Sequence, residues 1–128
     1  MISNTLRVCT AALLFLIALA CHSNPGSSDL TIEYNTTPQP VRVGPATIDL
    51  KLTQKNGAPL SGARVELEGN MSHPGMTPVR GEASEIAPGA YRGTLQLTMA
   101  GDWIVLVHIT LADGQRLQRE IELKAVRP

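Results

Sequence analysis

Residues 103–111 read WIVLVHITL, and this run decides the fold that the sequence predicts. Valine and isoleucine are frequent in it, as they are in strands with two apolar faces. An Asp113–Gly114 pair follows, and the next residues, 116–124, mostly alternate polar and apolar side chains. An Asp-Gly pair between two such runs is typical of a tight β-hairpin. The stretch therefore predicts two antiparallel strands, the first of them central in its sheet.

Runs upstream of this hairpin show the period of two that marks strands with one buried face. Alternating apolar residues occur in 46–52, 65–67 and 91–99. Turn signals separate the runs, at Asn56–Gly57, Ser61–Gly62, Pro88–Gly89 and 100–102. The sequence has no helical period of useful length. We therefore expect an all-β domain over residues 31–128, an immunoglobulin-like antiparallel β-sandwich of about seven strands.

The composition of the 128 residues limits the possible functions. Eleven Lys and Arg residues balance eleven Asp and Glu residues, so the formal net charge is zero. This balance argues against nucleic-acid binding, which relies on a basic excess. The two cysteines, Cys9 and Cys21, provide neither a disulfide scaffold nor a zinc site built from cysteines.

The sequence also argues against an enzyme. It shows no nucleophile motif and no glycine-rich loop for binding phosphate. Two pairs of acids, Glu66/Glu68 and Glu120/Glu122, occupy the polar positions of alternating runs. We interpret them as solvated faces and as edge-strand charge against aggregation, and not as catalytic pairs.

The N-terminal segment has the features of an export signal. Arg7 precedes an uncharged run over residues 8–21, VCTAALLFLIALAC, which is too short to cross a bilayer as a helix. Its length and charged front match a signal-peptide core, so residues 1–20 are predicted to be a signal peptide. The run ends Ala-Leu-Ala-Cys21, which resembles the lipobox of bacterial lipoproteins.

This resemblance implies cleavage before Cys21 and attachment of diacylglycerol to its sulfur, followed by a third acyl chain such as palmitate. Several acyl chains give stable membrane anchoring. Residues 21–30 would then be the lipidated cysteine and a flexible tether. His22 stands where Asp would favour the inner membrane, so we expect an outer-membrane anchor facing the periplasm. The alternative is an ordinary signal peptide in which Cys21 has no role.

One loop, residues 69–78, departs from the strand pattern. It contains Met71, His73 and Met76, in the spacing Met-x-His-x-x-Met. Thioether and imidazole groups are soft ligands that suit Cu(I) and suit Mg²⁺ poorly. The loop is therefore a candidate Cu(I) site. The alternative is structural, because methionine often fills gaps in cores and a lone loop histidine is usually solvated.

Two further residues are secondary metal-ligand candidates. Met99 is expected to end its strand on the core-facing side, where packing is its simpler role. His108 lies in the middle of the apolar run 103–111. We expect a buried or half-buried histidine with a hydrogen-bonding partner.

These residues together resemble a known family. The chain is similar to the YtkA-like domain, related to FixH-like envelope proteins, over about residues 31–124. The resemblance is carried by Met71-x-His73-x-x-Met76-x-Pro78, Pro88-Gly89-x-Tyr91 and Leu97-x-Met99-x-Gly101-x-Trp103. It implies a small β-sandwich, often secreted or lipid-anchored, with some members associated with copper handling, copper efflux or oxidase assembly. It also implies that the metal-binding loop falls on Met71, His73 and Met76, whereas Gly89, Tyr91, Gly101 and Trp103 are structural.

Two departures from the family pattern weigh against oxidase assembly: the loop has one histidine, and the chain lacks the transmembrane anchor of FixH-like proteins.

Two hypotheses for the function then remain. The first is a lipid-anchored module that binds Cu(I) and relays it to an envelope partner. The second is a metal-free interaction or structural module of the cell envelope, in which the methionine loop is an adaptable contact surface.

Overall fold

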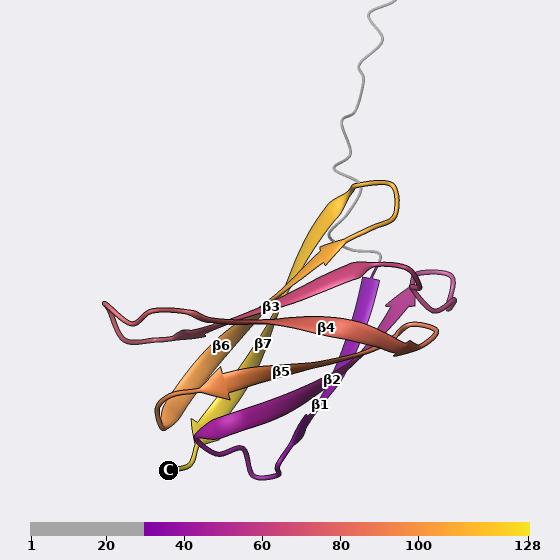
Figure 1. Ribbon diagram of the computed structural model, residues 1–128. Helices are drawn as coiled ribbons and strands as arrows, with labels where there is room; N and C mark the ends of the chain where they lie inside the picture. The colour runs from indigo at the N-terminus through magenta and orange to yellow at the C-terminus, as the bar shows by residue number, and fades with distance from the viewer. Residues whose placement is uncertain (1–29) are drawn as a thin grey trace, which may run out of the picture.

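The computed structural model describes residues 30–128, and their secondary structure is entirely β (Figure 1). The seven strands are β1 (Leu30–Thr37), β2 (Gly44–Gln54), β3 (Arg64–Met71), β4 (Val79–Ala87), β5 (Ala90–Leu97), β6 (Gly101–Thr110) and β7 (Arg116–Val126). Residues 30–128 contain no helix long and apolar enough to cross a membrane. The predicted signal peptide, Cys21 and the tether up to residue 29 lie outside the described residues.

All neighbouring strands of the sheet are antiparallel, in the order β1-β2-β5-β4-β3-β6-β7. This order is that of a constant-type immunoglobulin domain, with β1-β2-β5-β4 as one layer and β3-β6-β7 as the other. Pairing of β3 with β4, from Val65↔Ala83 to Gly69↔Val79, joins the layers into one curled, nearly closed barrel. The predicted all-β, seven-stranded, immunoglobulin-like architecture is confirmed.

The segment between β1 and β2 closes one end of the seam between the two edge strands. The Val43 amide donates to the Arg127 carbonyl at 2.8 Å, and the Arg127 amide donates to the Val41 carbonyl at 2.9 Å. Farther along the seam, the Tyr34 hydroxyl donates to the Glu122 carbonyl at 3.2 Å. The chain therefore pairs with β2 along β1, then crosses the seam to bond to the end of β7, and only then enters β2.

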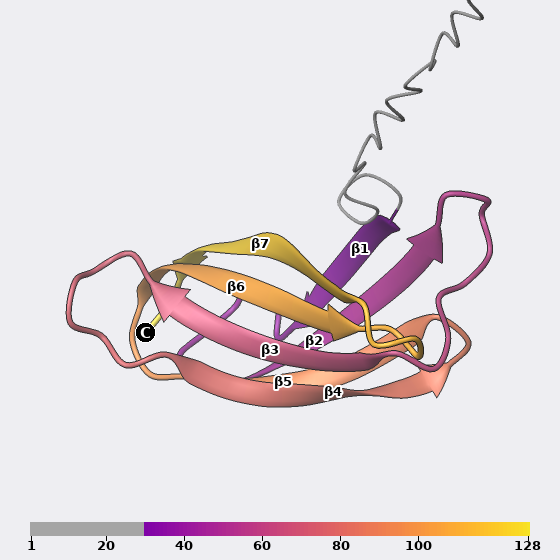
Figure 2. The same cartoon turned by 90° about the horizontal axis from the view of Figure 1, so that it is seen from above.

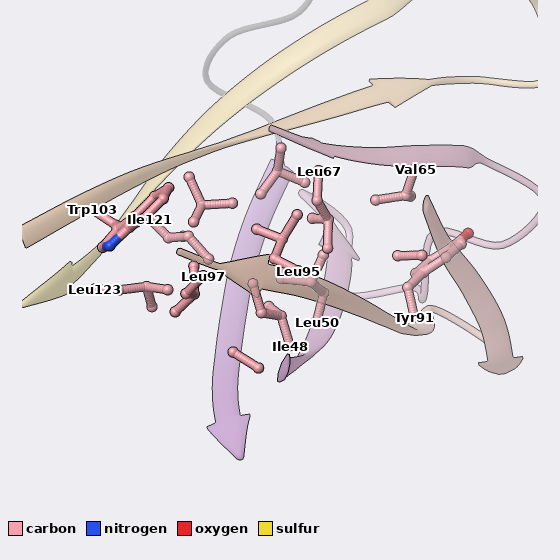
Figure 3. Close-up of a cluster of buried hydrophobic side chains, with 14 of the residues drawn as sticks. Ile48, Leu50, Val65, Leu67, Tyr91, Leu95, Leu97, Trp103, Ile121 and Leu123 are labelled. Carbon is pink, nitrogen blue, oxygen red and sulfur yellow. The ribbon is translucent and has the colours of Figure 1, made fainter. Parts of the chain in front are cut away.

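Alternation along the strands builds the core. Every second residue of β2, β5 and β6 is buried, and the large side chains interdigitate between the layers (Figure 3). Trp103 and Tyr91, each only 1% exposed, lie at opposite ends of this cluster. The other core residues are Ala46, Ile48, Leu50, Leu52, Val65, Leu67, Ala83, Leu95, Leu97, Val105, Val107, Ile109, Ile121, Leu123 and Val126.

The 103–111 run behaves differently from its prediction in one respect. β6 has a strand on each side, β3 and β7, so it is interior to the sheet, as expected. Only its odd-numbered residues enter the core, whereas Ile104, Leu106 and His108 are half-buried on the outer face. The predicted hairpin is confirmed: the Leu111 amide donates to the Gln115 carbonyl, and Gly114 adopts a φ of 87°.

Candidate metal-binding end of the barrel

The methionine loop is the connection between β3 and β4. Met71 is the last residue of β3, is half-buried and packs against the core. Its Cε lies 3.3 Å from the position that a Cβ on Gly101 would occupy. His73 and Met76 are exposed beyond the strand, and a turn at Pro74–Gly75, with a φ of 82° at Gly75, reverses the chain. The loop thus holds one thioether near the core and presents an imidazole and a second thioether to solvent.

Met99 lies at the same end, in the connection between β5 and β6. The expectation that it faces the core is wrong, because β5 ends at Leu97 and the Met99 residue is 47% exposed. Its carbonyl accepts a hydrogen bond from Trp103 Nε1 at 2.9 Å. Trp103 is in turn the cross-strand partner of Met71. The structure therefore brings the Met99 connection next to the residue that begins the methionine loop.

We call this part of the molecule the methionine end, and it comprises four segments and the residues Met71 and Gly101 beside them. The segments are residues 38–43, 72–78, 98–100 and 127–128, which connect or follow strands at one end of the barrel (Figure 2). Leu30, where β1 begins, lies at the opposite end, because it pairs with Gln54 whereas Thr37 pairs with Thr47. Four of the predicted metal-ligand candidates, Met71, His73, Met76 and Met99, therefore share one end.

His108 is not part of this group. It lies on the outer face of β6 opposite Glu66 in β3, and its Nε2 is 3.4 Å from Glu68 Oε2. Glu66 and Met71 are five positions apart in β3, a spacing of about 17 Å along a strand. The expectation of a half-buried histidine with a hydrogen-bonding partner is confirmed, and that partner is Glu68.

Glu68 is the centre of a polar cluster that the sequence did not reveal. Its side chain is only 18% exposed, and it accepts from Asn70 Nδ2 at 3.2 Å and pairs with Arg80 Nη2 at 3.3 Å. The interpretation of Glu68 as a solvated acid is therefore wrong, because three donors from three strands surround it. An open groove of about 610 Å³ passes over this cluster. It is lined by Arg64, Glu66, Glu68, Arg80, His108, Ile109, Thr110, Arg116, Leu117 and Gln118.

The environment of Glu68 lowers its pKa. The hydrogen bond from Asn70 has the largest effect, and Arg80 and His108 lower the pKa further, while partial burial opposes them. A carboxyl with a lowered folded-state pKa stabilises the protein above its unfolded-state pKa. That contribution is lost as the pH falls through the folded-state value.

We predict that Asn70→Ala will raise the pKa of Glu68, since the Asn70 hydrogen bond is the largest single cause of its lowering, and that His108→Gln will raise it as well. Carboxyl-carbon NMR titration of the three proteins measures this directly. The free energy of unfolding of Asn70→Ala should also fall less than that of the wild type as the pH drops below about 4.5. In the variant the pKa of Glu68 is lowered less by folding, so protonating this carboxylate removes less stability. An unchanged Glu68 pKa in Asn70→Ala would contradict the assignment.

The donors at the methionine end suit a soft metal better than a hard one. Across residues 30–128, no group of three or more His, Cys, Asp and Glu side chains is arranged to hold a metal ion. The methionine end offers thioethers instead, together with the His73 imidazole. Thioether sulfur and imidazole nitrogen are soft donors, which fits Cu(I) rather than the oxygen-preferring Mg²⁺ or Ca²⁺.

Comparison with known proteins places the chain in a family. No curated protein and no solved structure matches it. The family model described as YtkA-like matches residues 25–108, a stretch that contains β1 to β5, the methionine loop and most of β6. The resemblance drawn from the loop and the residues that follow it is thereby confirmed, and the chain belongs to the YtkA-like family.

Proposed function

We propose that this YtkA-like domain is a lipid-anchored module of the cell envelope that binds Cu(I) at its methionine end and relays it to a partner protein. Met71 and Met76 are the proposed thioether ligands, and His73 is the proposed imidazole ligand. Met99, in the neighbouring connection, is a further thioether that can join or replace them. The role is one of binding and transfer, without catalysis.

One observation carries this proposal. Two exposed connections at the same end of the barrel, 72–78 and 98–100, place Met76 and Met99 in solvent, with exposures of 37% and 47%. Exposed methionines are unusual in a small domain, since the side chain is apolar and is normally buried. Their association with His73 and Met71 supports a soft-metal site. An open arrangement on loops also supports transfer, because an incoming ligand from a partner can reach the ion.

We predict that the full chain binds one equivalent of Cu(I), measured anaerobically by competition with a chromogenic chelator. The double variant Met71→Leu/Met76→Leu removes both sulfurs while keeping side chains of similar volume. It should bind Cu(I) at least about tenfold more weakly, a loss of about 1.4 kcal/mol. Met99→Leu should reveal whether the third thioether contributes.

His108→Gln is the matched control, because it removes an imidazole that lies on the outer face of β6, away from the methionine end. It should leave the Cu(I) affinity unchanged. Equal affinities of the wild type and the double methionine variant would sink the site assignment. Because Met71 packs against the core, that outcome would favour the second candidate function, a metal-free interaction module.

The lipid anchor is proposed on Cys21, at the end of the uncharged run over residues 8–21. Leu30, the first described residue, lies at the end of the barrel opposite the methionine end. An anchor on that side leaves the methionine end facing away from the outer membrane, into the periplasm. Incorporation of labelled palmitate that persists in Cys21→Ser would rule out acylation at this residue.

A further inference from the structure

Exposed apolar side chains concentrate at the methionine end. Five large apolar side chains are exposed in residues 30–128: Tyr34, Val43, Met76, Ile86 and Met99. Three of them, Val43, Met76 and Met99, belong to the methionine end. Of the other two, Tyr34 lies within β1, and Ile86, which is 55% exposed, lies near the end of β4 beside the 88–89 turn at the opposite end. The end that carries the proposed copper ligands therefore exposes more large apolar side chains than the opposite end does.

Several segments of this end adjoin one another. Gly44 pairs with Leu97 at the start of β2, which brings Val43 beside the 98–100 connection. Val43 is bonded to Arg127, and Val126 pairs with Gly101. The Met71 side chain in turn reaches Gly101. The segments 38–43, 98–100 and 127–128 and the base of the methionine loop thus adjoin one another.

The charged side chains of this surface have one sign. Residues 38–43, 72–78, 98–100 and 127–128 contain no Asp or Glu, whereas they contain Arg42 and Arg127. Arg42 Nη1 also donates to the Pro128 oxygen at 3.4 Å. Both arginines are exposed. This local excess stands out in a chain whose formal net charge is zero. The nearby acid Asp102 is engaged on the neighbouring strand, where its Oδ1 accepts the Ala125 amide at 2.8 Å.

We infer that the methionine end is a docking surface for an acidic patch on a partner protein. Val43, Met76 and Met99 are its exposed apolar side chains, and Arg42 and Arg127 supply the complementary charge. This inference rests on the proposed function for its purpose, since the docked partner would face the copper ligands. Complementary charge at the rim of an interface speeds encounter and fixes orientation, which suits a transient transfer complex.

An anionic membrane surface is the weaker candidate for the same patch. Each cation near such a surface contributes about 1 kcal/mol, so two arginines give little. Membrane-binding surfaces also favour Trp, Phe and Leu, whereas this end exposes Val and Met. An acidic protein surface satisfies the two arginines and covers the three apolar side chains at once.

The experiment uses the full, metal-free chain and a short synthetic peptide rich in glutamate that contains methionine. We expect NMR shift changes confined to residues 41–43, 71–78, 98–101 and 127–128, and binding that weakens as salt is added. Arg42→Glu/Arg127→Glu should weaken the peptide affinity about tenfold. Arg116→Glu/Lys55→Glu makes the same change of charge elsewhere on the barrel and should leave the affinity within about twofold.

Three results would overturn the inference: equal binding of a lysine version of the peptide, equal losses in the two double variants, or shift changes elsewhere on the barrel. Binding to phosphatidylglycerol vesicles without binding to the peptide would overturn it in favour of a membrane surface. The test is separate from that of the proposed function. Peptide binding without Cu(I) binding would support the docking surface and contradict the copper relay. Cu(I) binding without peptide binding would support copper binding and contradict the docking surface.

Discussion

Replacing Trp103 by alanine is expected to lower the free energy of unfolding by about 4 kcal/mol, the usual cost of truncating a buried tryptophan. Trp103 is 1% exposed and fills the core at the methionine end. Small domains are stable by only about 5–15 kcal/mol, so the variant should be close to unfolding at 37 °C. Urea unfolding followed by far-UV circular dichroism measures the change, because Trp103 is the one tryptophan and fluorescence is lost with it.

Trp103→Phe separates packing from hydrogen bonding at the same position. Phenylalanine retains much of the buried ring but cannot donate to the Met99 carbonyl, which Trp103 Nε1 reaches at 2.9 Å. We expect a smaller loss, about 1–2 kcal/mol, together with greater mobility of residues 98–100 in NMR relaxation. A Trp103→Ala protein as stable as the wild type would show that packing of this indole in the core does not stabilise the fold.

Gly93→Ala is expected to cost about 3 kcal/mol, at the upper end of overpacking in a core. A Cβ at Gly93 would lie 2.8 Å from both the Glu82 carbonyl oxygen and Leu67 Cδ1. The leucine can rotate away, but the carbonyl belongs to the backbone of β4, which pairs with β5 at this point. The strand itself would have to move. Urea unfolding of the variant gives the measurement.

Gly57→Ala is the matched control for this substitution. Gly57 has a φ of 84°, and a Cβ there meets nothing within 4 Å. Alanine should therefore cost only the strain of the left-handed backbone, about 1 kcal/mol. If both variants lose the same stability, close packing between β4 and β5 is not the reason for glycine at position 93.

The sequence predicted the fold well where alternation is strong. The runs 46–52, 91–99 and 103–111 became interior strands because their apolar residues occupy every second position. β4 was not recognised as an individual strand, and its only buried side chain is Ala83. Its inner positions are small because β5 and Leu67 approach closely, and small residues leave no hydrophobic period to detect.

The candidate site was predicted in part. Local spacing was enough to select Met71, His73 and Met76, since the three lie within six residues at the end of β3 and in the connection that follows it. The proximity of Met99 was not predictable, because it depends on β5 ending at Leu97 and on the pairing of Met71 with Trp103. The contribution of Val43 and Arg127 depends on a contact between distant parts of the chain. No period or motif encodes such a contact.

The bonds that close the seam between residues 41–43 and Arg127 have a consequence for the timing of folding. Arg42 and Pro128, which also contact each other, are 86 positions apart. A ribosome must therefore synthesise nearly the whole domain before the first and last strands can meet, and long-range closure of this kind is slow. A chain still lacking β7 would keep its seam open, so closure of the barrel waits for the C-terminal strand.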